Sequence, residues 1–225
     1  TSPIAPSQLL NKIGTHLHDE NSILYQASKN NVPVAVHAED GTLLNEKIRE
    51  LKLKGRDDFR AYLEAHSPRV EVAGIRGAIR LAEEANAHTH ICHVSISDGL
   101  RIIFEAKRRG LPISCEVTPH HLFLSSQHLE RIGSVALTNP PLRSPADMMY
   151  LRRALQKGLI DVVASDHAPH ASKEKERSSV WDVSAGIAGL ETTLPLMLTM
   201  VNKGQLSLLT LVRVLMENPA KIFRF

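Results

Sequence analysis

Short apolar runs alternate with longer amphipathic ones along most of the 225-residue chain, and this alternation limits the possible folds more than any other feature. The apolar runs are rich in β-branched or small residues and end at polar or turn residues, as buried parallel strands do. They predict strands at residues 32–36, 90–94, 112–117, 134–138 and 159–164. The amphipathic runs predict helices at residues 18–30, 70–85, 97–109, 146–157, 190–202 and 207–216.

A repeated strand-then-helix order leaves two main folds, the open doubly wound sheet and the (β/α)8 barrel. No glycine-rich phosphate-binding motif follows any predicted strand, so the nucleotide-binding form of the open sheet has no support. We therefore expect an α/β fold of the (β/α)8 TIM-barrel type. A closed barrel needs eight strands and about 250 residues, and the chain does not begin with Met. We expect residues 1–225 to form a single barrel domain, truncated at both ends, that supplies roughly the second half of the barrel.

Composition excludes several classes of protein. The two cysteines, Cys92 and Cys115, cannot frame a disulfide scaffold and do not form a CxxC pair, which indicates reduced thiols. The longest apolar stretch, residues 194–201, is far shorter than a membrane span. A formal charge of +3 and 4% aromatic residues give neither the charge nor the stacking platforms of a nucleic-acid binder. We expect a cytoplasmic protein with no membrane or nucleic-acid partner.

Histidine, aspartate and asparagine gather where the predicted strands end. The strand ends read His37-Ala38-Glu39-Asp40, His93-Val94-Ser95, Thr118-Pro119-His120-His121, Thr138-Asn139-Pro140-Pro141 and Asp166-His167-Ala168-Pro169-His170. Barrel enzymes gather their catalytic residues at the carboxyl ends of the strands, and Zn²⁺ accepts imidazole and carboxylate ligands. The pattern predicts a metal-dependent hydrolase. Taken singly, each histidine could equally be a hydrogen-bonded structural residue, and Asp166 could cap a helix.

These strand ends, in this order, resemble the dihydroorotases of the amidohydrolase superfamily. The motifs that carry the resemblance are Val36-His37-Ala38-Glu39-Asp40, Cys92-His93-Val94-Ser95, Glu116-Val117-Thr118-Pro119-His120-His121-Leu122, Asn139-Pro140-Pro141-Leu142-Arg143, Ala164-Ser165-Asp166-His167-Ala168-Pro169-His170 with Lys175, and Gly186-Ile187-Ala188-Gly189-Leu190-Glu191-Thr192. The resemblance implies a catalytic barrel that holds one or two zinc ions. It also implies reversible hydrolysis of the cyclic amide of L-dihydroorotate to N-carbamoyl-L-aspartate, a step of pyrimidine biosynthesis.

The resemblance assigns metal-binding roles by position. It implies that His37 and His93 bind the more exposed metal, and that Asp166 binds the more buried metal and is the general acid/base. These roles suit the chemistry, because zinc lowers the pKa of a bound water to about 7 and polarises the carbonyl under attack. A carboxylate beside the nucleophile can then carry the proton to the leaving nitrogen.

The resemblance also implies a substrate site and residues that support the metal ligands. Asn139 and His170 are expected to bind substrate, as is the backbone around Ala185 and Gly186. A histidine that binds a metal is oriented by a hydrogen bond from its other ring nitrogen to an acceptor such as a carboxylate. The candidates for this role are Glu39, Asp40 and Glu116.

Two parts of the family pattern are absent from the sequence. One is the His-x-His of the first strand with the Arg that follows it, and the other is the lysine or aspartate that bridges the metals. The bridging residue is expected upstream of Thr1. The two His-x-His pairs present do not fit the family context, and we expect surface or capping roles for them: His16 with His18, and His88 with His90.

Several other residues carry weaker expectations. His66 and His128 lie in polar context and are expected to face solvent, and the cysteines are expected to pack rather than react. His120 and His121 are expected to line or support the site. The charged segment 171–184 is either a solvated loop or a lid anchored by Trp181.

Two alternatives to a dihydroorotase remain open at this point. The first is a related cyclic amidohydrolase: a hydantoinase, a dihydropyrimidinase or an allantoinase. The second is a catalytically silent, dihydroorotase-like subunit that serves as a structural partner, for instance of aspartate transcarbamoylase. A homo-oligomer is expected in either case, on the general frequency of symmetric assemblies.

Overall fold

A computed structural model describes residues 23–225 of the chain. At its centre lies a four-stranded parallel sheet in the order β1-β2-β3-β4. The strands are β1 (Val34–Val36), β2 (Thr89–Ile91), β3 (Ile113–Val117) and β4 (Val162–Val163). Val36 lies opposite Ile91, which lies opposite Cys115. Because strands that follow one another in sequence are neighbours and run parallel, each connection must cross over the sheet, as in a barrel segment.

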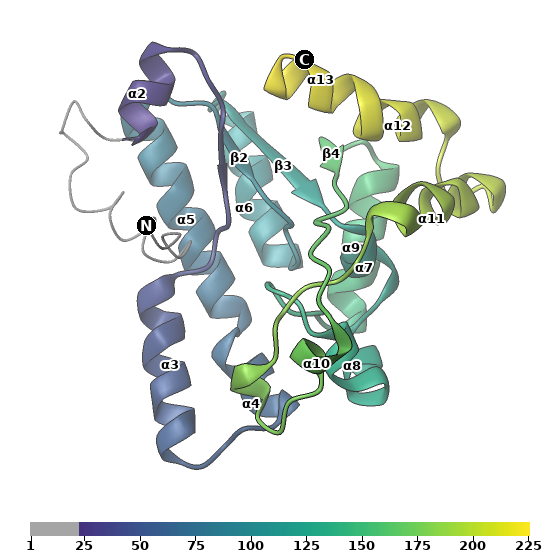
Figure 1. Ribbon diagram of the computed structural model, residues 1–225. Coiled ribbons are helices and arrows are strands. Elements are labelled where there is room, and N and C mark those ends of the chain that lie inside the picture. Colours follow the sequence, from purple (N-terminus) through teal and green to yellow (C-terminus); the bar gives the residue numbers. More distant parts are fainter. Residues whose placement is uncertain (1–22) are drawn as a thin grey trace.

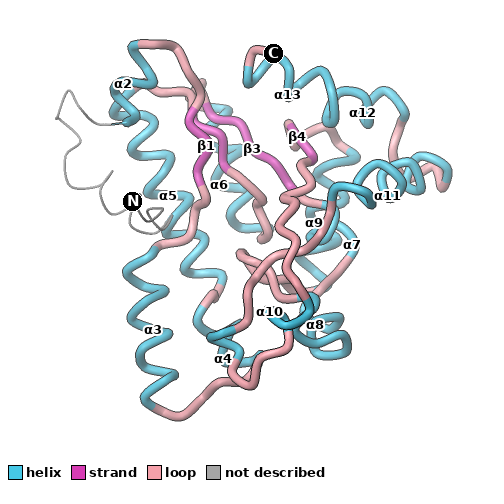
Figure 2. Tube along the Cα trace, in the orientation of Figure 1, coloured by secondary structure: helices cyan, strands magenta, loops and turns pink. Residues whose placement is uncertain are grey.

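Helices fill the connections between the strands (Figures 1 and 2). They are α2 (Ile23–Lys29), α3 (Gly41–Leu53), α4 (Phe59–Ala65), α5 (Pro68–Ala85), α6 (Ser97–Arg108), α7 (Pro119–Phe123), α8 (Ser126–Ile132), α9 (Pro145–Gln156), α10 (Ser172–Lys175), α11 (Leu190–Asn202), α12 (Leu208–Val212) and α13 (Asn218–Phe223). Two 3₁₀ turns, η1 (Gly133–Ala136) and η2 (Val180–Asp182), and a π-helical turn, η3 (Arg213–Glu217), complete the described elements. Figure 1 shows α4, α8 and α10 at the end of the sheet where the strands finish, and α12 and α13 at the opposite end.

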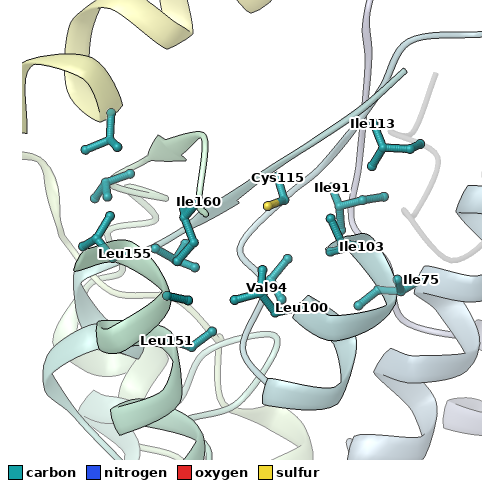
Figure 3. Packing of buried hydrophobic residues seen from close by; sticks show 14 of the residues in the cluster. Ile75, Ile91, Val94, Leu100, Ile103, Ile113, Cys115, Leu151, Leu155 and Ile160 are labelled. Atoms are coloured by element: carbon teal, nitrogen blue, oxygen red, sulfur yellow. The ribbon is translucent and has the colours of Figure 1, made fainter. Parts of the chain in front are cut away.

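The main hydrophobic core lies between the sheet and the crossover helices (Figure 3). Ile91 and Cys115 of the sheet pack in one cluster with Ile75 of α5, Ile103 of α6 and Leu155 of α9, and all five are fully buried. Burial of one such side chain contributes about 1.5–3 kcal/mol. The core therefore fixes the sheet, and with it the residues that follow each strand. None of the helices in residues 23–225 is long and apolar enough to cross a membrane.

One predicted strand and several boundaries are wrong. The segment 134–138 begins as the 3₁₀ turn η1 instead of a strand, because β4 pairs directly with β3 and leaves no edge between them. Ala136 and Leu137 pack instead in a second cluster with Tyr62 and Leu129. The predicted helix 207–216 is divided between α12 and η3, and the start of the predicted helix 18–30 lies outside the described residues. The sequence did not predict the helices α3, α4, α7, α8, α10 and α13.

Candidate metal and substrate site

A pair of histidines meets at the carboxyl ends of β1 and β2. His37 directly follows β1 and His93 lies two residues after β2, and the pairing of Val36 with Ile91 places the two strand ends side by side. His37 Nδ1 lies 3.1 Å from His93 Nε2. The two rings are 4.8 Å apart between centroids and meet edge to face.

Glu39 fixes the tautomer of His37. Its Oε2 lies 3.0 Å from His37 Nε2 and its Oε1 lies 2.9 Å from His66 Nδ1. Burial alone would raise the pKa of Glu39, but the hydrogen bonds from His37 and His66 outweigh burial and hold the pKa well below its usual range. An ionised carboxylate can only accept hydrogen bonds. His37 must therefore donate through Nε2, which leaves its Nδ1 lone pair directed at His93.

His93 is held neutral and in a strained backbone conformation. Burial and the neighbouring His37 lower the pKa of His93 to about 4. Its φ of 36° lies in the left-handed region, which costs a non-glycine residue about 1–3 kcal/mol. Its backbone N–H donates to Glu116 Oε1 at 3.3 Å. The buried His93 Nδ1 has no hydrogen-bond partner among the described residues.

Asp166, after β4, shares the left-handed backbone of His93, with a φ of 46°. Burial raises the pKa of its carboxyl, the nearby Glu116 carboxylate raises it further, and His37 lowers it. Asp166 is thus within electrostatic range of His37. Within residues 23–225, however, no three His, Cys, Asp or Glu side chains form a group that could hold a metal ion. The structure brings His37 and His93 together and leaves Asp166 outside that pair.

The His37–His93 pair suits a divalent metal that accepts nitrogen ligands. Each imidazole has an unprotonated nitrogen, because Glu39 accepts a hydrogen bond from Nε2 of His37 and burial keeps His93 neutral. A neutral imidazole oriented by a carboxylate is the usual form of a histidine ligand of zinc. The described part of the chain therefore holds two imidazoles that could bind such a metal, one of them already oriented.

The residues expected to bind substrate form a second group. Asn139 is exposed, and the hydroxyl of Tyr62 donates to its Oδ1. His170 Nε2 donates to the carbonyl of Ala185 at 3.1 Å, and the N–H of Gly186 donates to the carbonyl of Leu137 at 2.9 Å. The chain segment before Asn139 is thus hydrogen-bonded to the segment 185–186.

Lys175 connects the same two segments. Its buried ammonium donates to the carbonyls of Leu137, at 3.2 Å, and Gly186, at 2.5 Å. Gly186 has a φ of 149°, and a Cβ there would lie 2.7 Å from the carbonyl oxygen of Ala168. The position therefore requires glycine. No sequence signal other than the motif itself marks this role of Lys175.

The residues expected to support the ligands divide between two roles. Glu39 contacts His37, and Glu116 accepts hydrogen bonds from the backbone of His93 and from His90 Nε2 at 3.0 Å. Asp40 does not face the site, which corrects the expectation for that residue. Its side chain accepts from the N–H groups of Thr42 and Leu43 and caps α3.

The expectations for three histidines are corrected. His66 is buried instead of facing solvent, because Glu39 satisfies its Nδ1. His90 is fully buried and hydrogen-bonds to Ser114 Oγ at 2.8 Å as well as to Glu116. His88 is half-buried, and its Nε2 lies 3.0 Å from the same Ser114 Oγ. His128 is half-buried and interacts with Ser125 at the start of α8. His16 and His18 lie outside the described residues.

His120 and His121 differ in how their ring nitrogens are used. His121 accepts from the Thr118 hydroxyl at 2.8 Å through Nδ1 and donates to the Pro140 carbonyl at 3.1 Å through Nε2. His120 is also buried, but its Nε2 has no partner among the described residues. Burial and His93 lower the pKa of His120 to about 4. His121 therefore supports the loop that carries Asn139, and His120 lies within electrostatic range of His93.

The cysteines and Trp181 lie where packing dominates. Burial raises the pKa of both Cys92 and Cys115 to about 12, so neither is a reactive thiolate. Trp181 Nε1 donates to the carbonyl of Arg56 at 2.8 Å, and the N–H of Val180 donates to the carbonyl of Asp57 at 3.0 Å. The segment 171–184 is thus anchored by Trp181 on the connection between α3 and α4.

Imidazoles and carboxylates at the carboxyl ends of parallel strands define a barrel-type α/β protein with a candidate metal centre. The chain belongs to the amidohydrolase family, whose sequence pattern matches residues 17–225. It is 40% identical over 192 residues to the dihydroorotase of Methanothermobacter thermautotrophicus, and the matched region covers 85% of this chain and 42% of that protein. It is 39% identical over 193 residues to the L-hydantoinase of Paenarthrobacter aurescens, and this match covers 84% of this chain and 42% of that protein.

The solved structures give the same fold. The L-hydantoinase (dihydropyrimidinase) from Arthrobacter aurescens superposes with a TM-score of 0.88 at 34% identity, over 99% of this chain and 48% of that one. The chain spans less than half the length of each of these three relatives. The expected α/β fold of the TIM-barrel type and the membership of the amidohydrolase superfamily are both confirmed.

Proposed function

We propose that this chain is part of a zinc-dependent dihydroorotase, which interconverts L-dihydroorotate and N-carbamoyl-L-aspartate. The observation that carries the proposal is the His37–His93 pair, with the tautomer of His37 set by Glu39. The identity of 40% to a curated dihydroorotase supports the choice of reaction. In this proposal residues 1–225 belong to one catalytic barrel domain in the cytoplasm. A homo-oligomer and a contact with aspartate transcarbamoylase stay predictions from the sequence.

In the proposed mechanism, His37 and His93 would hold a metal ion, and Asp166 would serve both as a further ligand and as the general acid/base. One or two zinc ions would polarise the scissile carbonyl and lower the pKa of the attacking water to about 7. The Asp166 carboxylate accepts the proton of that water and returns it to the ring nitrogen as the amide bond breaks.

The substrate would be held by the second group of residues. Asn139 offers an exposed amide, His170 offers its ring, and the backbone at Ala185 and Gly186 forms a rigid rim fixed by Lys175. A cyclic amide with ring carbonyl and N–H groups presents both the acceptors and the donors that such a rim can bind.

The first test is metal content together with activity. We expect the purified full-length protein, with the strands that precede this chain in its relatives, to contain about one or two zinc ions per chain, as mono- and binuclear hydrolase sites do. Hydrolysis of dihydroorotate should be lost on chelation and return when zinc is added. Protein that binds no metal and hydrolyses no cyclic amide would instead support the silent structural subunit.

A hydantoinase is the second candidate, because L-hydantoinases are among both the sequence relatives and the structural neighbours. Dihydropyrimidinase and allantoinase are the other two alternatives, and the same assays test them. Assays with dihydroorotate, hydantoin, dihydrouracil and allantoin separate these enzymes. Hydrolysis of hydantoin with none of dihydroorotate would contradict our choice of substrate.

Gly186→Ala is expected to weaken substrate binding. The added Cβ meets the Ala168 carbonyl, and alanine is strained at a φ of 149°, so the rim must move away from His170. We expect KM to rise about tenfold, which corresponds to about 1.4 kcal/mol. Gly204→Ala is the matched control, because Gly204 also has a positive φ but no atom within 4 Å of the new Cβ. An unchanged KM in Gly186→Ala would remove this rim from the substrate site.

A further inference from the structure

The short helix α4 and the residue that follows it carry two buried polar side chains: Tyr62 lies in the helix, and His66 caps its carboxyl end. Their exposed fractions are 5% and 4%, and their rings lie 4.3 Å apart at an angle of 31°. The helix is fixed at its start by Asp58, whose side chain accepts from the N–H groups of Arg60 and Ala61. His66 directly follows the last residue of α4, and its ring packs against the ring of Tyr62 at the carboxyl end of the helix.

His66 reaches the candidate metal ligand through Glu39. One carboxylate oxygen of Glu39, Oε1, lies 2.9 Å from His66 Nδ1, and the other, Oε2, lies 3.0 Å from His37 Nε2. The backbone carbonyl of His66 accepts from Arg143, which is itself buried. His66 thus fixes the carboxylate on the side away from His37, and Arg143 fixes the end of the helix that carries His66.

Tyr62 reaches the candidate substrate ligand directly. Its hydroxyl lies 3.3 Å from the Thr138 carbonyl and also contacts Asn139 Oδ1. Both partners are acceptors, so the hydroxyl can only donate. The contact with Tyr62 at Oδ1 orients the amide of the exposed Asn139, whose NH₂ group is left to donate to an acceptor oxygen of a ligand.

We propose that Tyr62 and His66 are positioning residues, through which one helix orients a metal ligand and a substrate ligand at the same time. His66 sets the direction of His37 Nδ1 by way of Glu39, and Tyr62 selects a substrate oxygen for the Asn139 amide. The proposal rests on the proposed function for the roles of His37 and Asn139. It separates two measurable effects, since the His66 contact governs metal affinity and the Tyr62 contact governs substrate affinity.

The His66 contact is tested by the affinity for zinc, measured by competition with a chromophoric chelator in the purified protein. We expect His66→Leu to weaken zinc binding about 10- to 100-fold, the usual cost of losing a partner of a metal-binding histidine. His66→Asn keeps an N–H donor near the position of Nδ1 and should restore most of the affinity. His128→Leu is the control, because it removes a half-buried histidine from another short helix.

The Tyr62 contact is tested by steady-state kinetics of the zinc-loaded enzyme. We expect Tyr62→Phe to raise KM about tenfold, with kcat within about twofold and zinc affinity unchanged. Tyr150→Phe is the control, because Tyr150 lies on α9 against Arg101.

The two contacts fail in recognisable ways. Zinc affinity that is unchanged in His66→Leu, or equally weakened in His66→Asn, overturns the first contact. A loss of kcat without a change in KM in Tyr62→Phe overturns the second. An unmutated protein that binds zinc but hydrolyses no cyclic amide would instead overturn the proposed function, while the zinc measurements on the His66 variants would still decide the first contact.

Discussion

Replacing Asp166 with asparagine is expected to lower kcat by roughly 10³-fold, within the range of general acid–base catalysis. The amide can neither accept the proton of the attacking water nor carry the charge that binds a metal. The fold should persist, because asparagine tolerates the left-handed backbone that Asp166 adopts at a φ of 46°. The measurement is turnover of dihydroorotate alongside thermal unfolding of the same preparation.

The control for this variant is Asp182→Asn. Asp182 is an exposed carboxylate on η2, in the segment that follows Asp166. The change removes the same charge without touching the strand end, so kcat should stay within about twofold. Near-normal turnover in Asp166→Asn would remove Asp166 from the mechanism.

Arg143→Met is expected to lower the free energy of unfolding by about 3–5 kcal/mol, the cost of breaking a buried ion pair. Arg143 Nη2 lies 2.8 Å from Glu71 Oε2, and Nε donates to Ser95 Oγ at 2.8 Å. Arg143 and Glu71 are 7% and 1% exposed. Removing the guanidinium therefore leaves the Glu71 carboxylate buried without a counter-ion.

Urea denaturation measures this effect, and two further variants identify its cause. Arg143→Met with Glu71→Leu removes both charges and should recover part of the loss. Arg101→Met breaks an exposed ion pair with Asp98, 3.0 Å long, and should change stability by less than about 1 kcal/mol. Equal losses in Arg143→Met and Arg101→Met would contradict the assignment of a buried pair.

The strands and long helices could be predicted because they are periodic in apolar residues. The strands around Val36, Ile91, Val117 and Val163 and the helices α5, α6, α9 and α11 form where the pattern placed them, to within a few residues. The prediction of a strand at 134–138 is wrong because a short apolar run fits either a strand or a packed turn. The position beside β3 is taken by β4, and only the tertiary structure decides which of two apolar runs pairs there.

The strand-end residues were found from the sequence, but their supporting contacts were not. His37, His93 and Asp166 follow strands and stand out by position, whereas His66 lies 27 residues from Glu39 and looks like a polar loop residue. The same reasoning missed Tyr62, which lies 77 residues before Asn139. Contacts between distant polar residues carry no local periodicity, and they become visible only when the helix that brings them together, α4, is placed.

The left-handed backbone at His93 and Asp166 also sets how far this fold can be stabilised without losing its site. Each position stores about 1–3 kcal/mol of strain that the packed strands must hold. A selection for thermal stability alone would therefore favour replacing these two residues with ones that adopt a positive φ at lower cost, such as glycine. Stability and catalysis thus compete at the same two positions, and a laboratory selection for one should also screen for the other.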